Sequence, residues 1–321
     1  MNLDELRAAR ALVNRFVTPT PQYEWPLLSA QLGVKTIVKH ENHTPTGAFK
    51  VRGGLVYIDR LMRTGNPPPR LITATRGNHG QSIPFAARPH GLPVTVLVPE
   101  GNSRDKNAAM RGWGAEVEVY GVDFDTARLE AERRAAAGAG LLVPSFHDDL
   151  ILGVATYAAE LFENAPPLDA VYVPIGMGSG ICALIRTRDL LGLPTRIIGV
   201  VSAHADAMAR AFETGEPTPT ASAHTFADGI ATRMPNPDAL AEIRAGADHI
   251  VCVTDAEIAE AIRLLFRTTH QVAEGAGAAA CAALAQEQDR WRGKTVGIVI
   301  TGGNIDPEWF RSVLGGSTPA P

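Results

Sequence analysis

The sequence predicts an α/β protein with two domains, in which parallel or mixed twisted sheets are flanked by helices. Segments typical of strands and of helices alternate from Leu71 to Ala137, and a second such series runs from Ala170 to Ile300. Strands that are separated by helices pair in parallel through right-handed crossovers. The length of 321 residues is enough for two domains.

The first part of the chain predicts a helix, a strand and a second helix. Leu3 to Val17 has the apolar spacing of an amphipathic helix, and the Thr-Pro-Thr-Pro run after it is expected to stop that helix. Val34 to Val38 is rich in β-branched residues and predicts a short strand. A turn marked by proline and glycine follows, and apolar residues at helical spacing then predict a helix that starts close to Lys50.

The rest of the chain is divided by turns and linkers. Asn66 to Pro69 contains three prolines and reads as a linker, and the tail from Gly315 to Pro321 is expected to be frayed. Strands are expected at Leu71–Ala74, Val94–Val98, Glu116–Tyr120, Ala170–Val173, Arg196–Val201, His249–Val253 and Thr295–Ile300, and helices at Gln81–His90, Arg104–Trp113 and Asp125–Ala137.

Composition and charge exclude several classes of protein. The chain is 45% hydrophobic and 20% charged, as in an ordinary globular protein, and its net charge of −4 provides no basic field for nucleic acid or an anionic membrane. No apolar run reaches about 18 residues, so no transmembrane helix is expected, and the polar N-terminus is not that of a signal peptide. Cys182, Cys252 and Cys281 are expected to be buried thiols in a reducing compartment, the cytoplasm.

The stretch from Lys39 to Gly54 reads Lys-His-Glu-Asn-His-Thr-Pro-Thr-Gly-Ala-Phe-Lys-Val-Arg-Gly-Gly and places Lys50 near a helix start. A helix N-terminus carries partial positive charge, and burial beside Phe49 and Val51 would also favour the neutral amine. A neutral lysine amine is the nucleophile that forms a Schiff base with an aldehyde. The alternative is a lysine on the surface of a helix.

The same stretch closely resembles the lysine motif of the serine/threonine dehydratase family, Gly-Ala-Phe-Lys-x-Arg-Gly, although Ala48 stands where the family usually has serine. These enzymes use pyridoxal phosphate and have the tryptophan-synthase-β-like fold, also called fold type II. The resemblance implies that Lys50 is the catalytic lysine and that Phe49 lies beside the cofactor. It also implies a large cofactor-binding domain of residues 1–69 and 147–321, with a small domain of residues 70–146.

A second motif, Ala-Thr-Arg-Gly-Asn-His-Gly at residues 74–80, follows a predicted strand and opens a helix, where backbone amides can bind an anion. It resembles the family's Ser-x-Gly-Asn-His loop, which holds the substrate carboxylate. The resemblance implies that this loop binds substrate through Thr75, Arg76, Gly77, Asn78 and His79. Asn78 would also contact the ring hydroxyl of the cofactor, whereas the His79 side chain is expected to pack or cap.

Arg76 is the main departure from the family. Dehydratases that resemble this chain usually have a small residue there, and the serine racemases have a serine that serves as a second base. Arginine cannot act as a base at neutral pH, so racemase activity is disfavoured. Arg76 is expected either to clamp a second anionic group of the substrate or to point to solvent.

A third motif is the glycine-rich turn after a predicted strand, Gly176-Met177-Gly178-Ser179-Gly180. Glycines let the backbone approach an anion closely, and a helix N-terminus favours negative charge, but the spacing matches neither a P-loop nor a dinucleotide fingerprint. The turn resembles the family's tetraglycine loop, which implies that these five residues cradle the cofactor phosphate. Met177 must then adopt a backbone angle that a side chain tolerates.

The fourth motif, Thr-Gly-Gly-Asn at residues 301–304, ends the last predicted strand. In the family the matching hydroxyl lies against the pyridine nitrogen of the cofactor, a role that falls to Thr301. A neutral hydroxyl does not hold that nitrogen protonated as an aspartate would, so expulsion of a β-leaving group is favoured over a long-lived carbanion.

Two weaker matches concern acidic residues. Asp228 lies in a segment near which some relatives bind a divalent cation, but this chain has His224 and no glutamate there, so no metal is expected and Asp228 is expected to form structural hydrogen bonds. Glu274 opens a predicted helix, where it either faces the cofactor ring or interacts with the helix dipole.

Together the motifs predict a lyase that uses pyridoxal phosphate to eliminate the hydroxyl of a β-hydroxy-α-amino acid, giving a 2-oxo acid and ammonia. Threonine or serine is the default substrate, and 3-hydroxyaspartate and phenylserine remain open. The alternatives are a β-replacement enzyme similar to the cysteine synthases, an amino-acid racemase, and a ligand-binding protein of the same fold. Relatives commonly form dimers, so a homodimer is expected.

Overall fold

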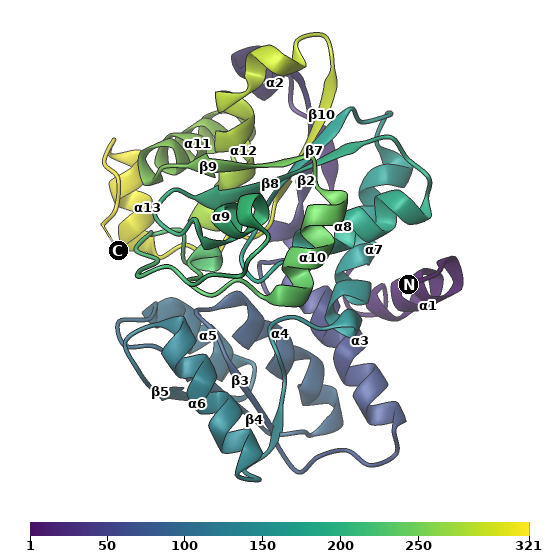
Figure 1. The fold of residues 1–321 in the computed structure, drawn as a ribbon, viewed down its shortest axis with the longest axis vertical. Coiled ribbons are helices and arrows are strands. Elements are labelled where there is room, and N and C mark those ends of the chain that lie inside the picture. Colours follow the sequence, from purple (N-terminus) through teal and green to yellow (C-terminus); the bar gives the residue numbers. More distant parts are fainter. Residues whose placement is uncertain (321) are drawn as a thin grey trace.

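Two sheets divide the chain into two lobes in the computed structural model, which describes residues 1–320 (Figure 1). The four-stranded sheet lies within residues 71–142 and defines the small lobe, and the six-stranded sheet defines the large lobe. The large-lobe sheet has the strand order β1-β2-β10-β7-β8-β9, and the small-lobe sheet has the order β5-β4-β3-β6. The strands are β1 (Gln22–Glu24), β2 (Lys35–His40), β3 (Leu71–Ala74), β4 (Val94–Val98), β5 (Ala115–Val119), β6 (Leu141–Leu142), β7 (Ala170–Pro174), β8 (Arg196–Ser202), β9 (His249–Val253) and β10 (Thr295–Ile300).

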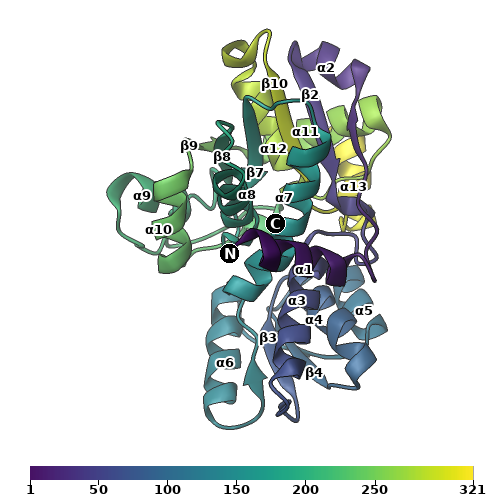
Figure 2. The same ribbon diagram turned by 90° about the vertical axis from the view of Figure 1, so that its right-hand side faces the viewer.

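Helices cover both faces of each sheet (Figures 1 and 2). The α-helices are α1 (Leu3–Val13), α2 (Pro26–Leu32), α3 (Lys50–Arg63), α4 (Asn78–Ala87), α5 (Arg104–Gly112), α6 (Phe124–Ala136), α7 (Asp148–Asn164), α8 (Ser179–Leu190), α9 (Ala207–Thr214), α10 (Pro237–Gly246), α11 (Asp255–Thr269), α12 (Gly275–Gln286) and α13 (Pro307–Leu314). Short 3-10 turns are η1 (Glu41–His43), η2 (Arg88–His90), η3 (Asp228–Ile230) and η4 (Gln288–Trp291).

The central strand β7 of the large lobe is apolar throughout because both of its faces are buried. Ala170 and Tyr172 pack in the core beneath α11 and α12, whereas Val171 and Val173 pack in the core beneath α7 and α8. All pairs of this sheet are parallel except β1 with β2, so the sheet is mixed as predicted. A parallel sheet covered on both faces requires such continuous apolar strands.

The small lobe repeats this arrangement with four parallel strands. Val94, Val96 and Val98 of β4 pack in the core beneath α4 and α5, and Leu97 packs on the other face against α6. Helix α3 packs against both α4 and α7, and α1 packs against α7 and α3 (Figure 2), so these helices connect the two lobes.

The predicted α/β class is confirmed, and most predicted elements are present with small shifts. The strands predicted at 71–74, 94–98, 249–253 and 295–300 have the predicted limits. Helix α1 ends at Val13 rather than Val17, because the amides of Arg15 and Phe16 bond to carbonyls three residues back, in tighter turns than those of an α-helix. Helix α4 starts at Asn78, three residues before the predicted start, and passes into a 3-10 turn at Arg88.

The cysteines and the C-terminal tail differ in how well they follow the predictions. Cys182 and Cys281 are buried, but Cys252 is exposed, because it lies on β9 at the edge of the sheet. The prediction of a buried thiol was therefore wrong at Cys252. Residues 315–320 form no helix or strand, and Pro321 of the predicted tail lies outside the described residues. Among residues 1–320, no helix combines the length and the apolar character needed to cross a membrane.

Candidate active site

A pocket between the two lobes brings together every site residue predicted from the sequence. Its lining residues surround about 770 Å³ of space, counted with the open space at the mouth of the pocket. The contributing loops leave the carboxyl ends of β3, β7 and β10, where ligands bind in open α/β sheets. The predicted residues that line it are Phe49, Lys50, Thr75, Arg76, Gly77, Asn78, His79, Gly176, Met177, Gly178, Ser179, Gly180 and Thr301.

Lys50 is the first residue of α3 and is held beside the end of β10. The amide of Phe49 donates a hydrogen bond to the Thr301 carbonyl (3.0 Å), and Ala48 pairs with Gly302 in an isolated β-bridge. Within residues 1–320, no carboxylate oxygen lies within 4.0 Å of Lys50 Nζ. Burial lowers the pKa of Lys50 to about 8, and the Glu274 carboxylate opposes this shift. A minor fraction of the amine is therefore neutral near neutral pH and available as a nucleophile.

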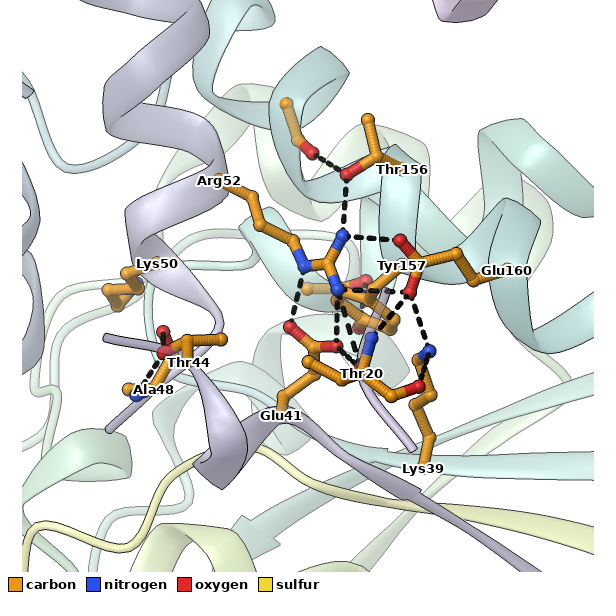
Figure 3. A network of polar contacts seen from close by, with 12 residues as sticks. Thr20, Lys39, Glu41, Thr44, Ala48, Lys50, Arg52, Thr156, Tyr157 and Glu160 are labelled. Atoms are coloured by element: carbon orange, nitrogen blue, oxygen red, sulfur yellow. Dashed lines mark hydrogen bonds and ion pairs between the residues drawn. The ribbon is translucent and has the colours of Figure 1, made fainter. Parts of the chain in front are cut away.

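Two residues after Lys50, the Arg52 side chain enters a buried ion network on the other side of α3 (Figure 3). Its guanidinium donates to Glu41 through Nε (2.8 Å) and to Glu160 through Nη1 (2.7 Å). Lys39 Nζ donates to the same Glu160 (2.6 Å) and to the Thr20 carbonyl (2.9 Å). Two cations and two anions balance, so the desolvated charges compensate one another.

This network fixes the strand, the turn and the helix around Lys50. Lys39 is on β2, Glu41 is on η1, Arg52 is on α3 and Glu160 is on α7. Burial lowers the pKa of Lys39, whereas for Arg52 the two glutamates outweigh the effect of burial and raise its pKa. Burial also acts to raise the pKa of Glu160, but Arg52 and Lys39 lower it overall. Lys39 and Glu41 belong to the lysine motif, but their place in a buried ion network was not predicted from the sequence.

The glycine-rich turn before α8 forms an open cradle of backbone amides. Gly178, the N-cap of α8, has φ +104°, which L side chains rarely adopt, and a Cβ there would lie 2.7 Å from that of Ala239. No side chain caps α8, so its first amides are free to bind an anion. Met177 does not have a positive φ, because His270 is the only non-glycine residue among 1–320 that does. The predicted tolerance of a side chain at this position is therefore observed.

The turn before α4 provides a second amide-lined site. The Thr75 hydroxyl accepts a hydrogen bond from the Gly77 amide (2.9 Å), and no side chain caps the first turn of the helix. Asn78 Nδ2 donates to Glu274 Oε1 (2.5 Å), and Asn78 Oδ1 accepts from Asn304 Nδ2 (2.9 Å). Asn78 is thus held in place by the large lobe, and the first amides of α4 remain open to a second anion.

His79 and Arg76 flank Asn78 with different chemical characters. His79 is buried, and burial followed by the nearby Lys50 charge lowers its pKa to about 3, so its imidazole is neutral. Arg76 is partly buried and lines the pocket, and its Nε is buried without a hydrogen-bond partner. The structure therefore places Arg76 in the pocket wall rather than simply in solvent.

The structure also brings in Lys106, which the sequence analysis missed. Its Nζ lies 2.6 Å from Asp228 Oδ2 and 3.0 Å from Glu274 Oε2, and all three residues line the pocket. Glu274 does not cap α12, and burial raises its pKa while Lys106 opposes that effect. The sequence did contain a signal for Lys106, which lies after β4. Because β3 and β4 are parallel, the carboxyl end of β4 lies at the same edge of the sheet as the Thr75–His79 loop, which follows β3.

The residues present fit pyridoxal phosphate, the cofactor that the sequence resemblance implies. Lys50 offers an amine for its aldehyde, and the uncapped N-terminus of α8 with its glycine turn offers amides for its phosphate. The Thr301 side chain belongs to the same pocket lining, and its hydroxyl has no hydrogen-bond partner among residues 1–320. The site can therefore hold a phosphorylated aldehyde together with a small carboxylate.

Comparison with known proteins gives matches over nearly the whole chain. A family profile described as pyridoxal-phosphate dependent enzyme matches residues 13–302. The chain is 32% identical over 315 residues to an L-threo-3-hydroxyaspartate ammonia-lyase of Pseudomonas sp, with 98% of each chain covered. It is 38% identical over 293 residues to an L-threonine ammonia-lyase of Geobacter sulfurreducens, covering 89% of this chain and 71% of that protein. The solved structure of threonine deaminase isoform 2 from Solanum lycopersicum superposes with a TM-score of 0.86 at 25% identity, covering 98% and 94% of the two chains.

Proposed function

Because the chain belongs to the family of pyridoxal-phosphate-dependent enzymes, we propose that it eliminates the β-hydroxyl of a hydroxyamino acid and releases a 2-oxo acid and ammonia. The predicted cofactor and the predicted fold type II are those of this family. Two relatives are named as ammonia-lyases, one for L-threo-3-hydroxyaspartate and one for L-threonine. The proposal rests on one observation: Lys50, which has no carboxylate partner, and the uncapped N-terminus of α8 line the same pocket.

Bound pyridoxal phosphate supplies an electron sink that makes the α-proton of an attached amino acid acidic. Lys50 Nζ is the base that takes this proton, because its pKa of about 8 leaves part of the amine unprotonated at neutral pH. The first amides of α8 and the turn before it would hold the cofactor phosphate; the residues concerned are Gly176, Met177, Gly178, Ser179 and Gly180. Phe49, the N-cap of α3, lines the pocket and would lie beside the bound cofactor.

Substrate is oriented by the turn before α4. The amides that follow Gly77 bind the α-carboxylate. Hydrogen bonds to Glu274 and Asn304 hold the Asn78 side chain in the position from which it would contact the cofactor. Thr301 presents a hydroxyl, which is neutral and does not hold a ring nitrogen protonated. A ring nitrogen that is not held protonated favours early loss of the β-hydroxyl over racemisation. Racemisation also needs a second base, and Arg76 cannot act as one.

The test is product analysis with the purified holoenzyme. We expect a hydroxyamino acid to yield equal amounts of 2-oxo acid and ammonia, and Lys50→Ala to abolish the reaction. Addition of sulfide distinguishes the β-replacement alternative, in which a thiol product would replace the 2-oxo acid. Chiral analysis of the remaining substrate distinguishes a racemase. Failure of every hydroxyamino acid to give a 2-oxo acid would contradict the proposal.

Three further features belong to the same proposal. Two domains, with limits at residues 69/70 and 146/147, are supported by the confinement of the four-stranded sheet to residues 71–142. A homodimer is expected from the family resemblance, and light scattering coupled to gel filtration tests it. Location in the cytoplasm is supported by the three cysteines, all of which are free thiols.

A further inference from the structure

The pocket contains one arginine, Arg76, and its charge is not matched by the protein. Among residues 1–320, no carboxylate oxygen lies within 4.0 Å of its guanidinium, and its Nε is buried without a hydrogen-bond partner. Leaving the Nε–H donor of Arg76 out of water without a partner costs free energy. A ligand that brings an anion to this position would remove that cost.

The two lysines of the pocket cannot serve this purpose. Lys106 is already bound by two carboxylates, Asp228 at 2.6 Å and Glu274 at 3.0 Å. Lys50 is committed to the cofactor aldehyde in the proposed function. Arg76 is therefore the positive charge in the pocket that is free for substrate.

Arg76 is a third anion site in addition to two that are built from backbone amides. The N-terminus of α8 serves the cofactor phosphate, and the N-terminus of α4 serves the α-carboxylate. A substrate with one carboxylate fills only the second of these sites and leaves Arg76 unmatched. A substrate with a carboxylate on its side chain fills all three.

From this arrangement we infer that Arg76 is a specificity-determining residue that binds a side-chain carboxylate, so that the enzyme prefers hydroxyamino acids with an acidic side chain. The inference rests on the proposed function and narrows its substrate class. A guanidinium binds a carboxylate through two parallel hydrogen bonds, which neither lysine nor a neutral amide reproduces.

The reaction balances for the four-carbon member of this class, 3-hydroxyaspartate. The α-carbon loses its proton to Lys50, and the β-carbon loses its hydroxyl, which leaves with a proton as water. One water returns when the carbon–nitrogen bond is hydrolysed, and ammonia leaves. The net change is 3-hydroxyaspartate to a four-carbon 2-oxo dicarboxylic acid and ammonia, and the side-chain carboxylate is retained throughout, so Arg76 can hold it from substrate to product.

The first experiment compares kcat/KM of the holoenzyme for 3-hydroxyaspartate and for threonine in wild type and Arg76→Gln. We expect Arg76→Gln to lower kcat/KM for 3-hydroxyaspartate by about 10- to 100-fold, the effect of losing hydrogen bonds to a charged group, and to change the value for threonine by less than about twofold. Arg88→Gln is the matched control, because Arg88 is exposed at the opposite end of α4, and it should change neither value. Equal losses for both substrates would place the α-carboxylate on Arg76 and overturn the inference.

The second experiment does not require turnover. Calorimetric titration of the holoenzyme with succinate and with butyrate compares two inert acids that differ by one carboxylate. We expect tighter binding of succinate in wild type and in Arg88→Gln, and loss of that preference in Arg76→Gln. If no hydroxyamino acid is turned over but this preference is present, the proposed reaction fails and the role of Arg76 stands. If succinate and butyrate bind alike in wild type, the role of Arg76 fails whatever the reaction is.

Discussion

Lys106 of the small lobe places its Nζ 2.6 Å from Asp228 Oδ2 of the large lobe. The same ammonium lies 3.0 Å from Glu274, whose other oxygen accepts a hydrogen bond from Asn78. Burial lowers the pKa of Lys106, but the two carboxylates outweigh this effect and raise it above its usual range. One buried cation therefore connects the two lobes at the wall of the pocket.

Replacement of Lys106 by Met should destabilise the protein strongly. The change leaves Asp228 and Glu274 without their shared cation, and breaking a buried ion pair in this way costs about 3–5 kcal/mol of unfolding free energy. Urea denaturation of the two proteins measures this difference. Adding Asp228→Asn to the variant should recover part of the loss, since one unpaired charge is removed.

Arg7→Met is the control for this prediction. Arg7 pairs with Asp4 on α1 at 3.3 Å, but both side chains are largely exposed, so the change should be within about 1 kcal/mol. A similar loss in Arg7→Met and Lys106→Met would show that the buried cluster has no special effect on stability.

Replacement of Arg52 by Met tests the network behind Lys50. The change leaves Glu41 and Glu160 with Lys39 alone, and we expect a loss of about 3–5 kcal/mol in urea denaturation. Arg63→Met is the control on the same helix, because Arg63 pairs with Asp59 at an exposed position. Equal effects of the two changes would contradict the account of the network.

The rate constant for the reaction of the apoprotein with pyridoxal phosphate should depend on pH through the ionisation of Lys50. Only the neutral amine attacks an aldehyde, and burial lowers the pKa of Lys50 from 10.5 to about 8. The rate constant should therefore rise with pH and level off above about 8. Stopped-flow absorbance measures it. A rate that keeps rising toward pH 10.5 would mean that Lys50 has the pKa of an exposed lysine.

Replacement of Gly178 by Ala should weaken cofactor binding. Its φ of +104° costs an L residue about 1–2 kcal/mol, and the new Cβ would lie 2.7 Å from that of Ala239. The turn must therefore shift, and its amides lose their alignment on the phosphate. Gly91→Ala is the control, since Gly91 has φ +64° but no atom within 4 Å of the new Cβ. Equal cofactor dissociation constants in wild type and Gly178→Ala would contradict the assigned role of the turn.

Most of the residues that meet in the pocket were predicted through the resemblance of four motifs to the dehydratase family, although Lys106 was missed. Lys50, Asn78, Gly178 and Thr301 each follow the carboxyl end of a strand or open a helix, and parallel strands bring such ends to one edge of their sheet. Local sequence therefore determined the position of these loops. The contacts made by Arg76 depend on side chains from other elements, so the sequence left two alternatives for this residue.

The features that were missed depend on tertiary contacts or lack a periodic pattern. Helix α7 was not predicted because residues 150–161 are all buried, so it lacks the solvent-facing polar stripe of an amphipathic helix. Lys106 lies far in sequence from Asp228 and Glu274, and only the folded chain joins them. The exposure of Cys252 follows from the position of β9 at a sheet edge, which the strand pattern alone does not reveal.

The measurement that tests the central claim most directly is borohydride reduction of the protein with pyridoxal phosphate, followed by peptide mass spectrometry. Lys50 differs from the other lysines in the chain, Lys35, Lys39, Lys106 and Lys294, because each of those has a carboxylate partner. We expect the reduced cofactor on Lys50 alone, with none in Lys50→Ala. Label on another lysine, or no label in wild type, would contradict the account of the pocket as a pyridoxal phosphate site.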